Sequence, residues 1–164
     1  RRSSDLAREI HPSWAFAVTR QESAFMADAR SHVGATGLMQ LMPATAKQVA
    51  SQLGMEHTNS RLTADPEYNI ALGSAYMREL LDRFNGSYVL AIAGYNAGPG
   101  RVREWLQANG DPRAEGVDVI DWIESIPIYE TRNYVQRVME ALHVYRARMN
   151  GGTAKLLLEE DLRR

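Results

Sequence analysis

Helix start and stop signals constrain this chain more than any other feature, because capping residues and prolines precede apolar stripes and glycines follow them. The clearest case is Asp65-Pro66-Glu67, an N-cap followed by a proline at the first helical position and an acid in the first turn. Apolar residues at three- and four-residue spacing then continue to the stop signal Asn85-Gly86. The same signals predict further helices over about 12–25 and 43–53, from Ser87 to a break at Ala97, from there to Leu106, and over 119–124 and 130–149.

Three segments do not follow the helical pattern. Residues 34–41 are rich in glycine and predict a turn that leads into a short extended piece. Ile126-Pro127-Ile128 must be extended, because the residue before a proline is pushed out of the α region. Residues 107–116 are polar and predict a surface loop.

The composition is that of one compact soluble domain, with 164 residues of which 45% are hydrophobic and 24% charged. The chain has no internal repeat, no low-complexity block and no shift of composition that would mark a second domain. We therefore expect residues 1–164 to form a single, mostly α domain with one small patch of extended chain.

Charge and residue usage exclude several classes of function. A formal net charge of -1 gives no cationic field for nucleic acid, and no apolar run approaches the roughly 18–20 residues that span a bilayer. The chain has no cysteine, its four histidines are scattered, and it carries neither a calcium loop nor a phosphate-binding glycine loop. We expect no metal, no nucleotide and no other cofactor.

The first residues bear on localisation. No signal-type apolar segment follows residues 1–5. We therefore expect either a cytosolic protein or a mature fragment whose export signal lies elsewhere.

Glu22 is the most unusual carboxylate, because it shares a predicted helix face with Trp14 and Val18. Burial and the negative C-terminal end of a helix would both raise the pKa of such a carboxyl and suit it to act as a general acid. The alternative is a partly exposed glutamate paired with Arg20 or Arg30. Periodicity alone favours this alternative.

Other residues are candidates for ligand contact, each with a purely structural alternative. Tyr95-Asn96 precedes the run Ala97-Gly98-Pro99-Gly100, so a flat ring and an amide suited to a sugar stand next to exposed backbone, although a helix C-cap has the same residues. Gly37-Leu38-Met39-Gln40 with Met42 is either a ligand-lining turn or a plain turn with core methionines. Glu130 follows the extended segment, but an acid at a helix start needs no function to explain it.

Four motifs taken in order resemble the catalytic domain of the soluble lytic murein transglycosylases. They are Glu22-Ser23, Gly37-Leu38-Met39-Gln40, Gly94-Tyr95-Asn96-Ala97-Gly98 and the segment from Ile126 to Val135. The similarity covers roughly residues 12–149, and Gly94 stands where many members have alanine. The resemblance implies a lysozyme-like α domain with a small antiparallel β patch. Nothing carries over to the loop around residues 109–118.

The resemblance also assigns roles to individual residues. It reverses the preference for Glu22 as a partly exposed, paired glutamate without a catalytic role. It implies that Glu22 is the sole catalytic acid and base. It further implies that six residues line the glycan groove or support that glutamate: Ser31, Gln40, Met42, Tyr95, Asn96 and Glu130.

The implied reaction cleaves the bond between N-acetylmuramic acid and N-acetylglucosamine in peptidoglycan without water and leaves a 1,6-anhydro end. A hydrolytic muramidase, with Asp28 or Glu130 as a second carboxylate, is one alternative, and a non-catalytic peptidoglycan-binding module is another. The resemblance further implies the C-terminal part of a longer periplasmic protein whose partner is the glycan strand.

Overall fold

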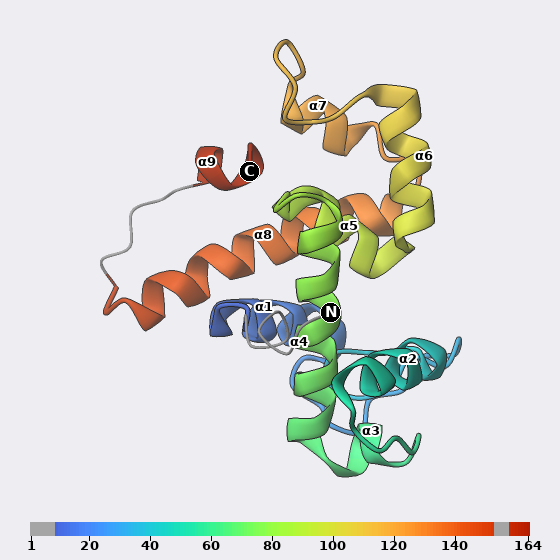
Figure 1. Ribbon diagram of the computed structural model, residues 1–164. Coiled ribbons are helices and arrows are strands. Elements are labelled where there is room, and N and C mark those ends of the chain that lie inside the picture. The colour runs from blue at the N-terminus through green and yellow to red at the C-terminus, as the bar shows by residue number, and fades with distance from the viewer. Residues whose placement is uncertain (1–8, 153–157) are drawn as a thin grey trace. The chain divides into compact units, whose positions relative to one another are not determined.

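The computed structural model describes residues 9–152 and 158–164, which form helices joined by loops (Figure 1). Residues 1–5, considered above for an export signal, lie outside the described part of the chain. In chain order the helices are α1 (Pro12–Ser23), α2 (Pro43–Leu53), α3 (Arg61–Ala64), α4 (Pro66–Arg83), α5 (Tyr88–Ala97), α6 (Pro99–Asn109), α7 (Val119–Glu124), α8 (Tyr129–Met149) and α9 (Leu158–Leu162).

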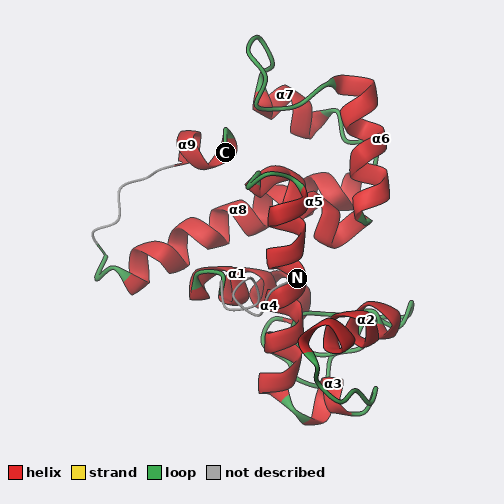
Figure 2. Cartoon of the chain, in the orientation of Figure 1, coloured by secondary structure: helices red, strands yellow, loops and turns green. Residues whose placement is uncertain are grey.

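The predicted mostly α class is confirmed, whereas the small β patch is not formed as a sheet. The described residues contain no strand, as Figure 2 shows, and the extended piece is limited to isolated antiparallel bridges of Thr36 with Arg30 and with Leu41. Gly37 at φ 81° and Gln40 at φ 49° turn the chain between Thr36 and Leu41, so these residues do not form a continuous extended strand. None of the helices in the described ranges has both the length and the apolar character needed to cross a membrane.

The chain divides into two compact units, Arg1–Arg78 and Glu79–Arg164. The first unit contains α1 to α3 and most of α4, and the second contains the end of α4 and α5 to α9. Each unit has its own buried apolar side chains, for example Leu72 in the first and Ile92 in the second.

Helix α1 begins as predicted and ends two residues early. The His11 ring accepts a hydrogen bond from the Ser13 amide and caps the start of the helix. Ala24 and Phe25 both have left-handed backbones, at φ 50° and 65°, and two such residues in succession stop an α-helix. Phe25, the last residue of the predicted helix, therefore lies beyond the helix end and is 47% exposed.

Helix α4 starts at the predicted cap. A carboxylate oxygen of Asp65 accepts a hydrogen bond from the Tyr68 amide at 3.1 Å, and the other carboxylate oxygen lies 3.1 Å from the Arg61 guanidinium. The backbone hydrogen bond from Tyr68, followed by the one from Arg61, holds the pKa of Asp65 below its ordinary value. The local signals therefore predicted this helix start correctly.

Helix α5 is the centre of the second unit and packs against α6, α8 and α9. The Ser87 hydroxyl caps it by accepting a hydrogen bond from the Leu90 amide, and every residue from Val89 to Gly94 is buried. A Cβ atom at Gly94 would lie 3.2 Å from a ring carbon of Phe84. The absence of a side chain at Gly94 therefore leaves room for this phenylalanine.

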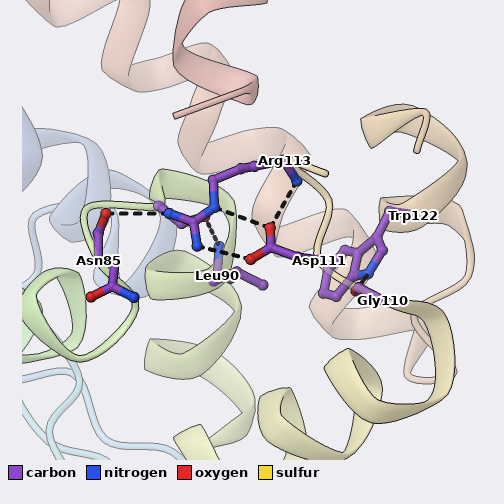
Figure 3. Close-up of polar contacts among 7 residues, drawn as sticks. Asn85, Leu90, Gly110, Asp111, Arg113 and Trp122 are labelled. Atoms are coloured by element: carbon purple, nitrogen blue, oxygen red, sulfur yellow. Dashed lines mark hydrogen bonds and ion pairs between the residues drawn. The ribbon is translucent and has the colours of Figure 1, made fainter. Parts of the chain in front are cut away.

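The loop of residues 110–118 begins later than predicted, because α6 continues to Asn109. Figure 3 shows how polar contacts hold the loop: the Arg113 guanidinium donates to both carboxylate oxygens of Asp111, at 3.0 and 2.9 Å, and to the Asn85 carbonyl at 3.2 Å. The Trp122 indole donates to the Gly110 carbonyl at 2.8 Å. The loop is therefore held by its own Asp111–Arg113 pair and by contacts with Asn85 and with Trp122 of α7.

Helix α9 was not predicted from the sequence. Its Asp161 carboxylate is buried and lies 2.6 Å from the Arg146 guanidinium of α8. The Arg164 guanidinium, just beyond the helix, donates to the Tyr88 hydroxyl of α5 at 2.8 Å. These long-range charged contacts attach a five-residue helix that has little periodic signal of its own.

The Asp111–Arg113 pair predicts an acid dependence of stability. The hydrogen bond from Arg113 lowers the pKa of Asp111 from its ordinary value of 3.8, so the pair stabilises the fold above that pH and loses this effect as the pH falls through the lowered pKa. We expect Asp111→Asn to lower the stability by less than about 1 kcal/mol at neutral pH, because the pair is partly exposed. Thermal melting of both proteins from neutral pH to about pH 3 should show their difference shrinking in acid.

The matched control is Glu115→Gln, which neutralises an exposed carboxylate in the same loop. A difference between wild type and Asp111→Asn that stays constant with pH would contradict the role given to the Asp111 carboxylate.

Candidate active site

Glu22 lies in the last turn of α1 and is half-buried, between the buried face and solvent. Trp14 and Val18 on the same helix are 3% and 0% exposed, so the face on which the glutamate was predicted is indeed the buried one. The end of α1 also places the carboxyl at the negative end of the helix dipole.

The residue after Glu22 attaches this helix end to the glycine-rich loop. The buried Ser23 hydroxyl lies 2.7 Å from the Leu38 carbonyl oxygen and 3.2 Å from the carbonyl oxygen of Thr19 one turn back. Two motifs separated by 15 residues in sequence are thus joined by one hydrogen bond.

The loop itself is fixed by Asn69, which belongs to α4 and is fully buried. Its side-chain nitrogen donates to the carbonyl oxygens of Thr36 and Leu62, both at 3.0 Å. Its side-chain oxygen accepts from the Met39 amide at 2.9 Å. Asn69 therefore provides hydrogen-bond partners for backbone groups of a loop that has no strand or helix to pair them.

Gln40 is half-buried and turned toward the backbone of the same loop. Its side-chain nitrogen donates to the carbonyl oxygens of Ala29 and Gly37, at 3.0 and 2.8 Å. Its own backbone is left-handed at φ 49°. A non-glycine residue in this conformation is held there by its surroundings, and such outliers are common at functional sites.

Ser31 and Met42 lie on either side of this loop. The Ser31 hydroxyl accepts from the Ala35 amide at 3.0 Å, and the Ser31 amide donates to the Ala35 carbonyl at 2.9 Å. Met42 precedes α2 and is 43% exposed, with its terminal methyl carbon 4.0 Å from the point where a Cβ atom of Gly34 would lie. The exposed methionine is available to an apolar ligand surface.

The second unit holds the other three predicted site residues. Tyr95 and Asn96 are half-buried in the last turn of α5, and Glu130 is exposed in the first turn of α8. The buried Thr131 hydroxyl donates to the Asn96 side-chain oxygen at 2.7 Å. Here too, one hydrogen bond joins two motifs that are distant in sequence.

Each unit thus joins its own pair of motifs, Glu22-Ser23 with the loop around Leu38 in the first and Asn96 with Thr131 in the second. Three residues that make these links were missed as site residues: Ser23, Asn69 and Thr131. Ser23 and Thr131 belong to the motifs already noted, and Asn69 is an amide on the apolar stripe of α4, four residues before Gly73. A polar side chain on a stripe that must be buried is a signal that could have been used.

The acidic and histidine side chains of the site do not gather into a metal centre. Over residues 9–152 and 158–164, no group of three or more His, Cys, Asp or Glu side chains is arranged to hold a metal ion.

Comparison with known families decides the relationship of this chain. A family model described as the transglycosylase SLT domain matches residues 2–116. The chain belongs to this family. The match includes Glu22, Ser31, Gln40 and Met42 of the SLT domain and also Tyr95-Asn96.

Individual relatives agree with the family assignment. The SLT-domain chain is 40% identical over 85% of its length to the soluble lytic murein transglycosylase of Escherichia coli K12, and it covers 21% of that protein. It is 38% identical over 94% of its length to a putative soluble lytic murein transglycosylase of Haemophilus influenzae, of which it covers 26%. The chain thus spans about a fifth to a quarter of the length of the curated relatives it matches.

Solved structures give the same result. A crystal structure of an inactive mutant of the lytic transglycosylase Slt from Pseudomonas aeruginosa is 48% identical, with a TM-score of 0.78 over 90% of this chain and 24% of that one. The 70-kDa soluble lytic transglycosylase of Escherichia coli is 36% identical, with a TM-score of 0.79 over 95% of this chain and 26% of that one. The lysozyme-like helical fold predicted from the motifs is therefore confirmed.

Gly37 provides a direct test of the loop packing in the SLT domain. A Cβ atom there would lie 2.2 Å from both the Asn69 side-chain nitrogen and the Leu62 carbonyl oxygen, on a backbone at φ 81°. We expect Gly37→Ala to cost roughly 3 kcal/mol or more, because overpacking adds to the left-handed strain. Denaturant unfolding measures this loss.

Gly54→Ala is the matched control, because Gly54 has a similar φ of 69° with nothing within 4 Å of its Cβ position. Its expected cost is about 1–2 kcal/mol, from the left-handed backbone alone. Equal losses in the two variants would contradict the close approach of Asn69 to the loop.

Proposed function

We propose that this chain is a peptidoglycan lytic transglycosylase, which cleaves the β-1,4 bond between N-acetylmuramic acid and N-acetylglucosamine and leaves a 1,6-anhydromuramic acid end. The observation that carries the proposal is the hydrogen bond from Ser23 to the Leu38 carbonyl, which ties Glu22 to the Gly37–Gln40 loop. The names of the relatives, which are lytic murein transglycosylases, support the same reaction.

The first step needs a general acid. The Glu22 carboxyl donates its proton to the glycosidic oxygen while the bond from that oxygen to C1 of the muramoyl sugar breaks. The bonding electrons leave with the oxygen, which becomes a hydroxyl of the departing N-acetylglucosamine. The substrate's own acetamide group stabilises the positive charge that develops at C1.

The second step uses the same group as a base. The Glu22 carboxylate takes the proton of the muramoyl C6 hydroxyl, whose oxygen then bonds to C1 and closes the anhydro ring. Glu22 ends protonated, as it began, and no water is consumed. One carboxyl is sufficient because the nucleophile belongs to the substrate, in contrast to glycosidases that use two carboxylates.

The remaining predicted site residues act as groove residues in this proposal. In this proposal Ser31, Gln40 and Met42 of the first unit contact the glycan or support Glu22. Tyr95, Asn96 and Glu130 of the second unit contact the glycan. An aromatic ring and an amide suit the flat apolar face and the acetamide of an amino sugar. The hydrogen bond from Thr131 fixes the orientation of the Asn96 amide and supports its role in recognition.

We further infer a periplasmic location, with residues 1–164 forming a catalytic domain at the C-terminal end of a longer protein. The short share of each relative that the chain covers supports its being one domain of a longer protein. The periplasm is where a murein substrate would be met by such an enzyme. The partner is the glycan strand of peptidoglycan.

Product analysis tests the reaction. Digestion of purified murein should release muropeptides that end in the 1,6-anhydro sugar, because the C6 hydroxyl closes the ring in place of water. Mass spectrometry distinguishes these products from hydrolytic ones. Products heavier by one water, with a free reducing end, would make the protein a muramidase instead.

Replacement of the acid tests the assignment of Glu22. Glu22→Gln keeps nearly the same shape and removes the titratable proton, so the fold and murein binding should persist while turnover falls by about 10⁴-fold, the upper part of the range for acid–base assistance. A glutamate-to-glutamine substitution also makes the inactive form of the Pseudomonas relative. Turbidity clearing of murein, thermal melting and murein pull-down are measured on the same purified variant.

Glu56→Gln is the matched control, since it neutralises an exposed carboxylate of the same unit that lies outside the site. The control should clear murein at the wild-type rate. Clearing by Glu22→Gln at a comparable rate would overturn both the assignment and the mechanism.

A further inference from the structure

We propose that Asn69 is a positioning residue for the reaction at Glu22, an inference that rests on the proposed function. Asn69 touches no reacting atom in this proposal. Its side chain fixes the loop that holds the end of α1, and through that contact it sets the place of the catalytic carboxyl.

Asn69 binds backbone groups on both sides of Leu38. The Thr36 carbonyl and the Met39 amide, on either side of Leu38, both bond to the Asn69 side chain, at 3.0 and 2.9 Å. These contacts span 33 and 30 residues of sequence. The Leu38 carbonyl therefore lies in a backbone segment that is anchored on both sides by one buried amide.

The Leu38 carbonyl in turn holds the end of α1. It accepts the Ser23 hydroxyl at 2.7 Å, and Ser23 is the last residue of the helix and the neighbour of Glu22. The chain then passes through the left-handed Ala24 and Phe25, a conformation that costs energy and relaxes unless contacts retain it. The Ser23 contact is therefore placed where loss of support would let the last helical turn move.

No other side chain of this size matches the three hydrogen bonds of the Asn69 side chain. The site requires a donor group for two carbonyl oxygens, Thr36 and Leu62, and an acceptor for the Met39 amide. A neutral amide supplies both, and the orientation of its nitrogen and oxygen is fixed by these partners. An aspartate has the same shape but no donor when ionised.

Asn69→Asp therefore makes the positioning sensitive to pH. The introduced carboxyl is fully buried, so its pKa is raised, and in acid its O–H group donates to one of the two carbonyls. At about pH 8 it is ionised and faces carbonyl oxygens without a donor. We expect kcat on murein, relative to wild type at each pH, to fall by roughly 10²-fold at about pH 8 and to recover partly near pH 5.

Murein binding separates positioning from recognition. In the Glu22→Gln background, Asn69→Asp should leave murein pull-down largely unchanged, because Asn69 acts on the carboxyl and not on the glycan. The effect should therefore appear in kcat and spare KM. A parallel loss of binding would indicate a general collapse of the groove.

A double-mutant cycle provides a second test that does not depend on the folding of the aspartate variant. Asn69→Ser is neutral and too short to reach all three partners, and Ser23→Ala removes the link between the loop and α1. If Asn69 acts through this link, the double variant should lose no more kcat than the more affected single variant. Losses that multiply would show two independent structural effects and would overturn the proposal.

Amide hydrogen exchange tests the coupling without any activity. The Ala24 amide donates to the Arg20 carbonyl and the Met26 amide to the Ser23 carbonyl, so both report on the end of α1. Asn69→Ser should raise their exchange by about 10-fold or more through local opening. If wild type released no anhydro products, the proposed function would fail, yet this exchange would still decide whether Asn69 holds the helix end.

Val49→Ala is the matched control, since it removes buried volume from α2 in the same unit without a polar contact. It lowers stability while leaving kcat per folded molecule, its pH dependence and exchange at Ala24 and Met26 close to wild type. If Asn69→Asp and Asn69→Ser behaved like Val49→Ala in all three measurements, Asn69 would be a stabilising residue only and the proposal would be wrong.

Discussion

The first unit depends on one buried amide that satisfies backbone groups where no sheet exists. A loop with only isolated bridges leaves carbonyl and amide groups that would be costly to bury unpaired. Asn69 of α4 pairs with two of them, the Thr36 carbonyl and the Met39 amide, and also with the Leu62 carbonyl of α3. The Leu38 carbonyl, and with it the hydrogen bond from Ser23, takes its place from this arrangement, so the setting of Glu22 depends on a residue 47 positions further along the chain (69 − 22).

The two units join their sequence motifs in the same way. In each, a helix end that carries a motif residue is joined to a second motif by a short hydrogen bond from a buried hydroxyl, Ser23 in one and Thr131 in the other. Hydroxyl donors suit this purpose, because they rotate to meet an oxygen and leave the backbone unchanged. Motifs that are far apart in the sequence are therefore joined in pairs by hydrogen bonds in the folded chain.

Local signals predicted the fold well where the physics is local. The bounds of α2 and the cap at Asp65 agree with prediction, because prolines and capping carboxylates act on the nearest turn. The predicted face of Glu22 was also correct, although the helix was extended two residues too far, to Phe25, which has a left-handed backbone and is exposed. Periodicity marks Asn69 as a polar side chain on a buried face, but the contacts of Asn69, Thr131 and α9 could not be predicted, because their partners are distant in sequence.

Gly94, in the buried part of helix α5, has a consequence for how sequences of this family vary. An added Cβ at this position would lie 3.2 Å from the Phe84 ring, closer than an ordinary contact. Positions 84 and 94 are therefore expected to covary, with a smaller or differently shaped side chain at 84 wherever alanine stands at 94. Each residue would then be neutral in its own background and harmful in the other, so the path between the two forms passes through a less stable intermediate or through a simultaneous change.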